Sequence, residues 1–272
     1  MIKSRWEQAA VTLVLAAGGL AMALPFIWML LSSFKTESEA LAVPPTLFPK
    51  TFSFQSYIGL FERLDFGVYL TNTLIVVLFS MLGLLLDTMA GYAFAKFRFR
   101  GNRALFVLVL ATMMIPGQVK MIPMYIIVSE MNLTNTMAGI VIPGLASAFN
   151  IFLVRQFMST IPDELLEAAR LDGAGEFRIF ATMILALSKS VLAVQAIFTF
   201  IGAWNSFLWP LIVANDDALF TLSVGMSLLK GQYSTDFALQ MAGSAFMVIP
   251  VLIVYTVFQR YIIQGFNLSG LK

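Results

Sequence analysis

The chain has 272 residues, of which 59% are hydrophobic and 12% are charged, and its net charge is +2 at neutral pH. A soluble domain usually has about a quarter charged residues, so this composition indicates a polytopic membrane protein with one membrane domain, residues 1–272. The sequence has no Cys and no His, which argues against a disulfide framework, a thiolate or imidazole metal site and a haem protein. It also has no GxxxxGK[ST] loop to hold a nucleotide.

Six apolar segments are long enough to cross a membrane, which takes roughly 20 residues as a helix. They lie at about 9–34, 68–95, 104–128, 137–158, 186–209 and 238–262. The first contains an Ala21-Met22-Ala23 sequence that imitates a signal-peptide cleavage site, but its apolar run continues to Phe34. We therefore expect an all-α integral membrane fold with six transmembrane helices, the first of them a retained anchor.

The distribution of Lys and Arg predicts the orientation of the spans, because these residues are enriched in cytoplasmic loops. One set of segments holds twelve of the seventeen: Lys3, Arg5, Lys96, Arg98, Arg100, Arg103, Arg155, Arg170, Arg178, Lys189, Arg260 and Lys272. The opposite set, formed by the segments 35–67, 129–136 and 210–237, holds four: Lys35, Lys50, Arg63 and Lys230. Lys120 falls inside a span. Both chain termini and the loop 159–187 are thus expected in the cytoplasm.

The second span contains Asp87, about two turns from its cytoplasmic end. An ionisable residue inside a membrane is a candidate functional residue. The alternative is that Asp87 bonds to a neighbouring helix or reaches the interface near Lys96, and we favour this alternative because the helix end is close.

The third span is interrupted by Pro116, Gly117 and Pro123. A broken helix is tolerated in a membrane where it faces protein or a water-filled cavity. Two interpretations stay open. In one, the bend lines a translocation path in which Gln118 and Lys120 offer donors to hydroxyls or anions. In the other, it packs against a neighbour while Lys120 extends to the interface.

The loop between the fourth and fifth spans concentrates charge in an otherwise apolar chain. Its charged residues are Asp163, Glu164, Glu167, Arg170, Asp172, Glu176 and Arg178. A membrane protein that gathers charge in one loop presents that loop to a soluble partner.

Sequence signals predict a short helix in this loop. Thr160, three residues before Asp163, suggests a capping box, and Gly173 suits a helix C-terminus that needs positive φ. Leu165, Ala168 and Ala169 are expected on one face, where two alanines allow another surface to approach closely. A second helix is expected over about 176–187.

The end of the fifth span combines Trp204 with Asn205, and an aromatic ring beside an amide suits a sugar. The alternative for the aromatic residues here is an interfacial belt, which is common for a residue such as Trp209. The loop that follows predicts a turn at 215–217 and a short interfacial helix over 218–229. The tail 264–272 is expected to be flexible.

Several segments together resemble a known family. Glu167-Ala168-Ala169, three further residues and Gly173 resemble the EAA loop of ATP-binding-cassette (ABC) importer permeases. The family pattern ends in Leu-Pro, whereas this chain has Leu185-Ala186. Residues 33–36, 91–99, 115–119 and 204–211 are similar to the MalG-like carbohydrate permeases, in the same order along the chain.

The resemblance implies a transport subunit that is not itself an enzyme, in the cell inner membrane. The substrate would be a mono-, di- or oligosaccharide, or a related polyol or glycerol phosphate. Glu167, Ala168, Ala169, Asp172 and Gly173 would couple it to an ABC ATPase dimer that binds ATP and Mg²⁺. A second permease subunit and an extracytoplasmic solute-binding protein would complete the assembly within the lipid bilayer, and the tail would reach the ATPases. No metal, catalytic residue or nucleic-acid partner is implied.

Two other classes remain as alternatives. A stand-alone proton- or sodium-coupled carrier would depend on Asp87, but the sparse intramembrane charge counts against it. A scaffold that uses the charged loop to recruit an enzyme is disfavoured by the broken third span and the polar residues of the fifth.

Overall fold

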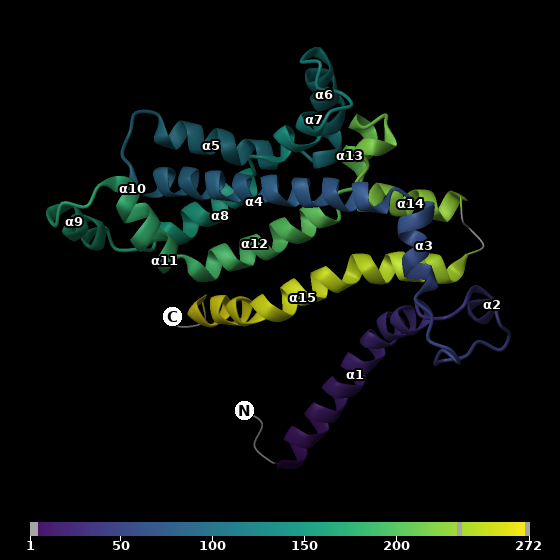
Figure 1. Ribbon diagram of the computed structural model, residues 1–272. Coiled ribbons are helices and arrows are strands. Elements are labelled where there is room, and N and C mark those ends of the chain that lie inside the picture. Colours follow the sequence, from purple (N-terminus) through teal and green to yellow (C-terminus); the bar gives the residue numbers. More distant parts are fainter. Residues whose placement is uncertain (1–4, 233–235, 270–272) are drawn as a thin grey trace. The chain divides into compact units, whose positions relative to one another are not determined.

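A computed structural model of the chain describes residues 5–232 and 236–269, and in this part every regular element is helical (Figure 1). The first half contains α1 (Arg5–Ser32), α2 (Glu37–Ala40), α3 (Gln55–Arg63), α4 (Phe66–Lys96), α5 (Asn102–Met113), α6 (Gly117–Glu130), α7 (Met137–Val141) and the 3-10 turn η1 (Ile142–Gly144). Next come α8 (Ala148–Met158), α9 (Asp163–Leu171), α10 (Glu176–Ile179), the π-helical turn η2 (Phe180–Ile184), α11 (Leu185–Leu187) and α12 (Lys189–Trp204). The chain ends with α13 (Leu208–Val213), the 3-10 turn η3 (Asp217–Leu219), α14 (Leu222–Gln232) and α15 (Phe237–Ser269).

Five of these segments are long and apolar enough to cross a membrane: Arg5–Ser32, Phe66–Lys96, Met137–Met158, Lys189–Val213 and Phe237–Tyr261. The pair α5 and α6 makes a sixth if a helix bent by 105° at Pro116 counts as one span. The all-helical membrane fold is therefore confirmed, and so is the break expected in the third span.

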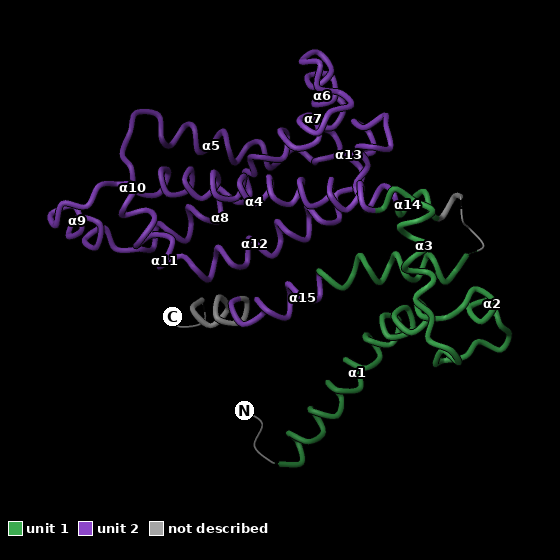
Figure 2. The backbone as a smooth tube through the Cα atoms, viewed as in Figure 1, with its two compact units in different colours: residues 1–66, 226–250 green, residues 67–225, 251–272 purple. Residues whose placement is uncertain are grey.

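Contacts divide the chain into two compact units, shown in Figure 2. Unit 1 comprises residues 1–66 and 226–250, and unit 2 comprises residues 67–225 and 251–272. The single permease domain remains a prediction. Residues 264–269, expected as a flexible tail, form the last part of α15, and 270–272 lie outside the described residues.

Unit 1 joins the first 66 residues of the chain to residues 226–250 through a few specific contacts. Arg63 at the end of α3 forms a 2.9 Å ion pair with Asp236, just before α15. Phe66 packs edge-on between Phe61 and Phe246. Lys35, which is buried, donates a hydrogen bond to the carbonyl of Thr46.

Helix α4 runs the length of unit 2 and owes its placement to one buried stripe. The residues on this stripe recur every three or four positions: Tyr69, Asn72, Thr73, Val76, Gly83, Leu84, Asp87, Thr88 and Tyr92. Several of these are small or polar, while the exposed face consists mostly of Leu, Val, Phe and Met. The buried face can be less apolar than the exposed one because lipid, rather than water, covers the outside of a membrane helix.

The fourth span is interrupted at 142–147, a break that the sequence analysis did not identify. Pro143 has no N–H to donate to the carbonyl of Gly139, and the indole Nε1 of Trp209 donates to that carbonyl instead, at 3.2 Å. The chain then continues into α8, which packs against α5 and α12. The break lies over Gly83 of α4, where an added Cβ would come within 2.5 Å of the carbonyl oxygen of Leu145.

Candidate functional site

Helix α9 is the short helix expected in the charged loop, but its N-terminus differs from the prediction. Its N-cap is Pro162, without a side-chain capping bond, so the capping box from Thr160 is wrong. The Thr160 hydroxyl instead donates to the carbonyl of Phe157 at 2.8 Å, because Thr160 lies in the turn that ends α8. Asp163 and Glu164 still place negative charge at the N-terminal end of the helix dipole.

The two faces of α9 are clearly different. Leu166 and Ala169 are buried in a cluster with Ile161, Ile179 and Phe180. Leu165, Glu167 and Ala168 are exposed, and Leu171 is 89% exposed. The expected face of Leu165, Ala168 and Ala169 is thus wrong, because Ala169 packs inside this chain whereas Leu165 and Ala168 are open to a partner.

The helix ends as predicted. Gly173 has φ of +82°, its N–H donates to the carbonyl of Arg170, and the N–H of Ala174 donates to the carbonyl of Ala169, both at 3.0 Å. This pair of bonds is a Schellman motif, in which a residue with a Cβ would be strained at Gly173. Asp172 is the exposed C-cap. The second helix follows as α10, η2 and α11 over 176–187, and it breaks at Ser188 without the proline of the family pattern.

Ion pairs join this loop to itself and to α4. The Lys96 ammonium contacts Asp163 at 2.6 Å, and the Arg170 Nε contacts Glu176 at 2.6 Å. The hydrogen bond and charge of Lys96 lower the pKa of the Asp163 carboxyl, and those of Arg170 lower the pKa of Glu176. Both carboxylates are therefore ionised at neutral pH.

A second polar group of residues surrounds Asp87, which is 3% exposed. Its two carboxylate oxygens accept the backbone N–H of Ser147, at 3.0 and 3.2 Å, and one accepts the amide of Asn150 at 3.1 Å. Asp87 therefore occupies the N-terminus of α8, which confirms the favoured interpretation that it bonds to a neighbouring segment. Nothing in these contacts supports an ion-coupled carrier.

A cavity of about 300 Å³ opens beside Asp87. Its polar lining includes Ser80, Asp87, Ser147, Asn150, Gln195 and Thr199. A neighbouring cavity of about 280 Å³ shares Ser80, Gly144, Gly202 and Ala203 with it and reaches Ser206 and Trp209. Hydroxyls, amides and one carboxylate gather here, a set that can exchange hydrogen bonds with a hydroxylated solute.

Gln195 of α12 is 1% exposed, and its Nε2 donates to the carbonyl of Asn150 at 3.0 Å. Its Oε1 has no hydrogen-bond partner within the described residues. Sequence reasoning missed Ser80, Asn150, Gln195 and Thr199; the available signal was a polar side chain within each apolar span.

The residues expected to line a path are not brought together. Gln118 and Lys120 lie exposed in the first turn of α6, after the bend. The Trp204 ring is buried and stacks on Phe200 at 5.8 Å between ring centroids, whereas Asn205 is exposed and donates to the carbonyl of Ile201. None of these four residues lines the two cavities beside Asp87.

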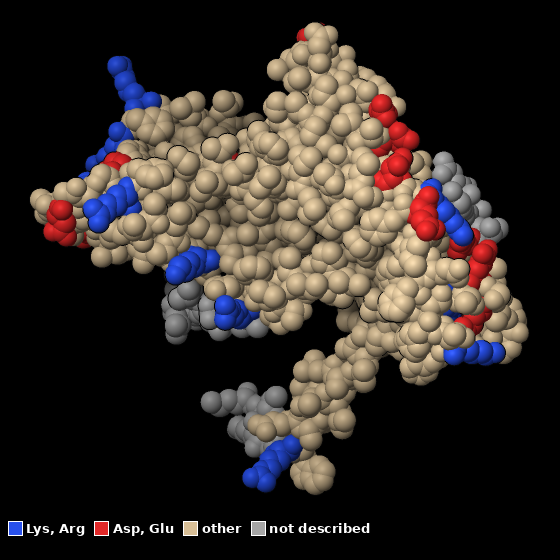
Figure 3. Space-filling view, in the orientation of Figure 1, with Lys and Arg blue, Asp and Glu red and all other residues tan. Residues whose placement is uncertain are grey.

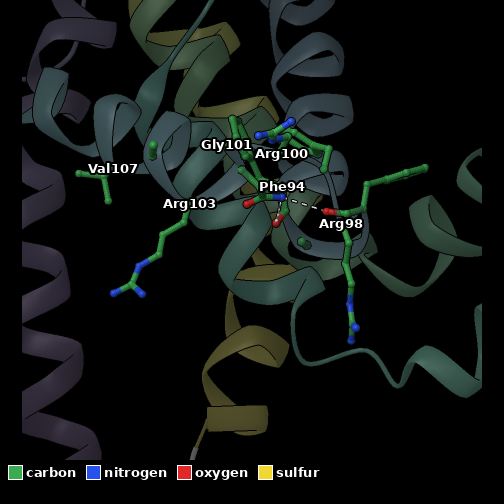
Figure 4. Close-up of a pocket in the computed structure, with 11 residues that line it drawn as sticks. Phe94, Arg98, Arg100, Gly101, Arg103 and Val107 are labelled. Atoms are coloured by element: carbon green, nitrogen blue, oxygen red, sulfur yellow. Dashed lines mark hydrogen bonds between the residues drawn. The ribbon is translucent and has the colours of Figure 1, made fainter.

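A larger cavity, of about 1040 Å³, lies at the turn between α4 and α5. Figure 4 shows that the side chains of Arg98, Arg100 and Arg103 extend from this turn in different directions and do not converge on one point. They form a broad basic surface, the type that attracts anionic lipid headgroups, and do not enclose a single ligand. Figure 3 shows this basic end of unit 2 beside the acidic residues of α9.

No group of three or more potential metal-ligating side chains occurs within the residues that the structure describes.

Comparison with known proteins gives a consistent result. The family model of the binding-protein-dependent transport system inner membrane component matches residues 87–267. The arabinooligosaccharides transport system permease protein AraQ of Bacillus subtilis is 35% identical, and the alignment covers 97% of this chain and 95% of the relative. The sn-glycerol-3-phosphate transport system permease protein UgpE of Brucella abortus is 32% identical, with 93% of each chain covered.

The fold is also similar to a solved structure. A chain from the crystal structure of a bacterial ABC transporter involved in the import of the acidic polysaccharide alginate superposes with a TM-score of 0.82 at 24% identity. The match covers 96% of this chain and 99% of the other.

Proposed function

Because this chain belongs to the family of binding-protein-dependent transport system inner membrane components, we propose that it is the permease subunit that passes a carbohydrate through the membrane in an ATP-driven importer. The relatives' names support a substrate that is a sugar, an oligosaccharide or a related glycerol phosphate. The chain itself has no nucleotide-binding loop, so a partner ATPase dimer would bind ATP and Mg²⁺.

The observation that carries the coupling proposal is the exposed face of α9. Glu167 and Ala168 are open on a short helix whose opposite face, at Leu166 and Ala169, is anchored in unit 2. Such a helix offers a small residue for close packing and a carboxylate for a basic partner surface. Asp172 and the turn at Gly173 would shape the edge of this contact with the ATPase.

The charges of unit 2 support an orientation with α9 in the cytoplasm, and the six-span prediction would then put both termini on that side as well. Lys96, Arg98, Arg100 and Arg103 end α4 and begin α5, near α9, whereas Asp216 and Asp217 follow α13 at the other end of unit 2 (Figure 1). The α13 end would then face the solute-binding protein that the family description implies.

The cavities beside Asp87 are the best candidate for this subunit's share of the translocation path. They lie among α4, α8 and α12 and are lined by groups able to pair with sugar hydroxyls. A homologous second permease would close the path. Gln118, Lys120, Trp204 and Asn205 remain candidates for other parts of it, since none of them lines these cavities.

The experiment compares two glycine variants of the assembled importer. Gly173→Val places a β-branched residue at φ of +82°, whereas Gly175→Val changes a residue with φ of −71°. An added Cβ meets nothing within 4 Å at either position. We expect Gly173→Val to abolish ATP-dependent uptake of labelled sugar while the protein still inserts, and Gly175→Val to retain uptake.

Affinity purification from the native membrane in mild detergent provides the matching assembly test. A P-loop ATPase and a second multi-span subunit should accompany the wild-type chain. Normal uptake by Gly173→Val would contradict coupling through α9, and a wild-type chain that purifies alone would contradict the importer itself.

A further inference from the structure

The segment 91–99 resembles the family, and the proposed function uses only its positive charge. It forms the last two turns of α4 and the start of the next loop. Tyr92 and Lys96 are four residues apart, so they lie on the same face of the helix, one turn apart. Both are directed at the loop that contains α9.

Lys96 holds the beginning of α9. Its ammonium donates to the carbonyl of Ile161 and to the carboxylate of Asp163, on either side of the N-cap Pro162. The Lys96 side chain is 4% exposed. The helix dipole opposes a cation at a helix N-terminus, so the two acceptors are what keep the lysine in this position.

Tyr92 holds the beginning of α10. Its hydroxyl lies 3.2 Å from Glu176 Oε2 and donates to it, and the other oxygen of Glu176 accepts the bond from Arg170 of α9. The Tyr92 ring packs on Phe180 at 5.6 Å between centroids. One face of α4 is thus bonded to both short helices of the loop.

The same helix is bonded to the break in the fourth span. Asp87 precedes Lys96 by nine residues, or about 14 Å along a helix. It accepts the N–H of Ser147, where α8 begins, and the amide of Asn150. Gln195 of α12 donates to the carbonyl of that same Asn150 and lines the cavity.

We infer that Tyr92 and Lys96 are positioning residues that transmit displacement of α9 to α4, and that α4 carries it through Asp87 to the break beside the cavity. The inference rests on the proposed coupling function of α9. A helix bonded at both points moves as one body, so the cavity would respond to the ATPase through α4 as well as through α8 and α12, which flank the loop.

The test uses variants that remove one polar group each. Tyr92→Phe keeps the ring packing and loses the hydroxyl, and Lys96→Met keeps an unbranched side chain and loses the ammonium. Tyr125→Phe and Lys189→Met are matched controls, because neither side chain has a hydrogen bond or ion pair within the described residues. The measured quantity is sugar transported per ATP hydrolysed by the complete importer in proteoliposomes.

We expect ATP hydrolysis to continue in Tyr92→Phe and Lys96→Met while sugar transported per ATP falls roughly five-fold or more, the lower range of coupling between sites. Asp163→Asn should add no further loss to Lys96→Met, because both substitutions remove the same ion pair between Lys96 and Asp163. Lys96→Arg, which keeps a cationic donor, should restore part of the ratio, and the controls should match the wild type.

An unchanged ratio in both variants would overturn the inference, and a parallel fall of transport and hydrolysis would show that the residues only hold the fold. If Gly173→Val lost uptake while Tyr92→Phe and Lys96→Met kept the wild-type ratio of sugar transported per ATP, the proposed function would stand and only this inference would fail. Failure of the wild-type complex to hydrolyse ATP during uptake would instead contradict the proposed function.

Discussion

The third and fourth spans are each broken at a proline, and the two breaks differ in whether their polar groups are bonded to other helices. At Pro116 the chain bends by 105° into α6, and the side chains that follow, Gln118 and Lys120, are exposed without hydrogen bonds in the described part of the chain. At Pro143 the freed carbonyl of Gly139 accepts a bond from Trp209, and the N–H of Ser147 is accepted by Asp87.

The difference shows that a proline specifies where a helix is interrupted but not what the interruption does. A break whose backbone groups are bonded to other helices is part of the packed interior, since unpaired backbone groups are costly where water is absent. The break at 142–147 borders the polar cavity, whereas the break at Pro116 leaves its polar side chains available to a partner or to the interface.

The largest expected effect comes from filling the space under the second break. Gly83→Val would place side-chain carbon against the backbone of Leu145, which cannot move aside cheaply. We expect a loss of about 3 kcal/mol in the free energy of unfolding, measured by denaturant titration of the purified chain in detergent. Gly117→Val at the first break is the control, because an added Cβ there meets nothing within 4 Å. If Gly83→Val and Gly117→Val lowered the free energy of unfolding equally, the two breaks would not differ in how tightly they are packed.

A smaller loss is expected when the carboxylate that caps α8 is removed. Asp87→Leu would leave the N–H of Ser147 and the amide of Asn150 without their acceptor. The same titration should show destabilisation of about 2 kcal/mol, and Asp87→Asn, which keeps one oxygen, should lose less. Gln118→Leu should stay within about 0.5 kcal/mol of the wild type. Wild-type stability in Asp87→Leu would argue against the capping contact.

The smallest effect concerns the freed carbonyl of Gly139. Trp209→Phe keeps an aromatic ring but removes the indole donor, at an expected cost of about 1 kcal/mol. Trp6→Phe is a suitable control because Trp6 is 86% exposed. If the two substitutions lower the melting temperature by the same amount, Trp209 acts only through its apolar surface.

The loop between the fourth and fifth spans shows which features local sequence signals can predict and which they cannot. Gly173 was identified correctly because a Schellman turn depends on the φ of one residue. The capping box at Thr160 was wrong because α8 continues to Met158 and its last turn takes the hydroxyl. The predicted face of α9 is also wrong, since three- and four-residue spacing defines which residues align on a helix but not which neighbour they meet.

The sequence by itself determined the class of molecule: apolar segments of span length, a charged loop with an EAA-like pattern, and the position of the first break all follow from local composition and spacing. Only the tertiary structure decided that Asp87 caps α8, that Trp209 pairs with the carbonyl freed by Pro143, and that Tyr92 and Lys96 hold α9 and α10. These contacts join residues 60 to 84 positions apart in the sequence. Local spacing carries no information on such pairs, because the free energy that selects them arises only when distant helices pack and each buried polar group must find its partners among the groups brought near it.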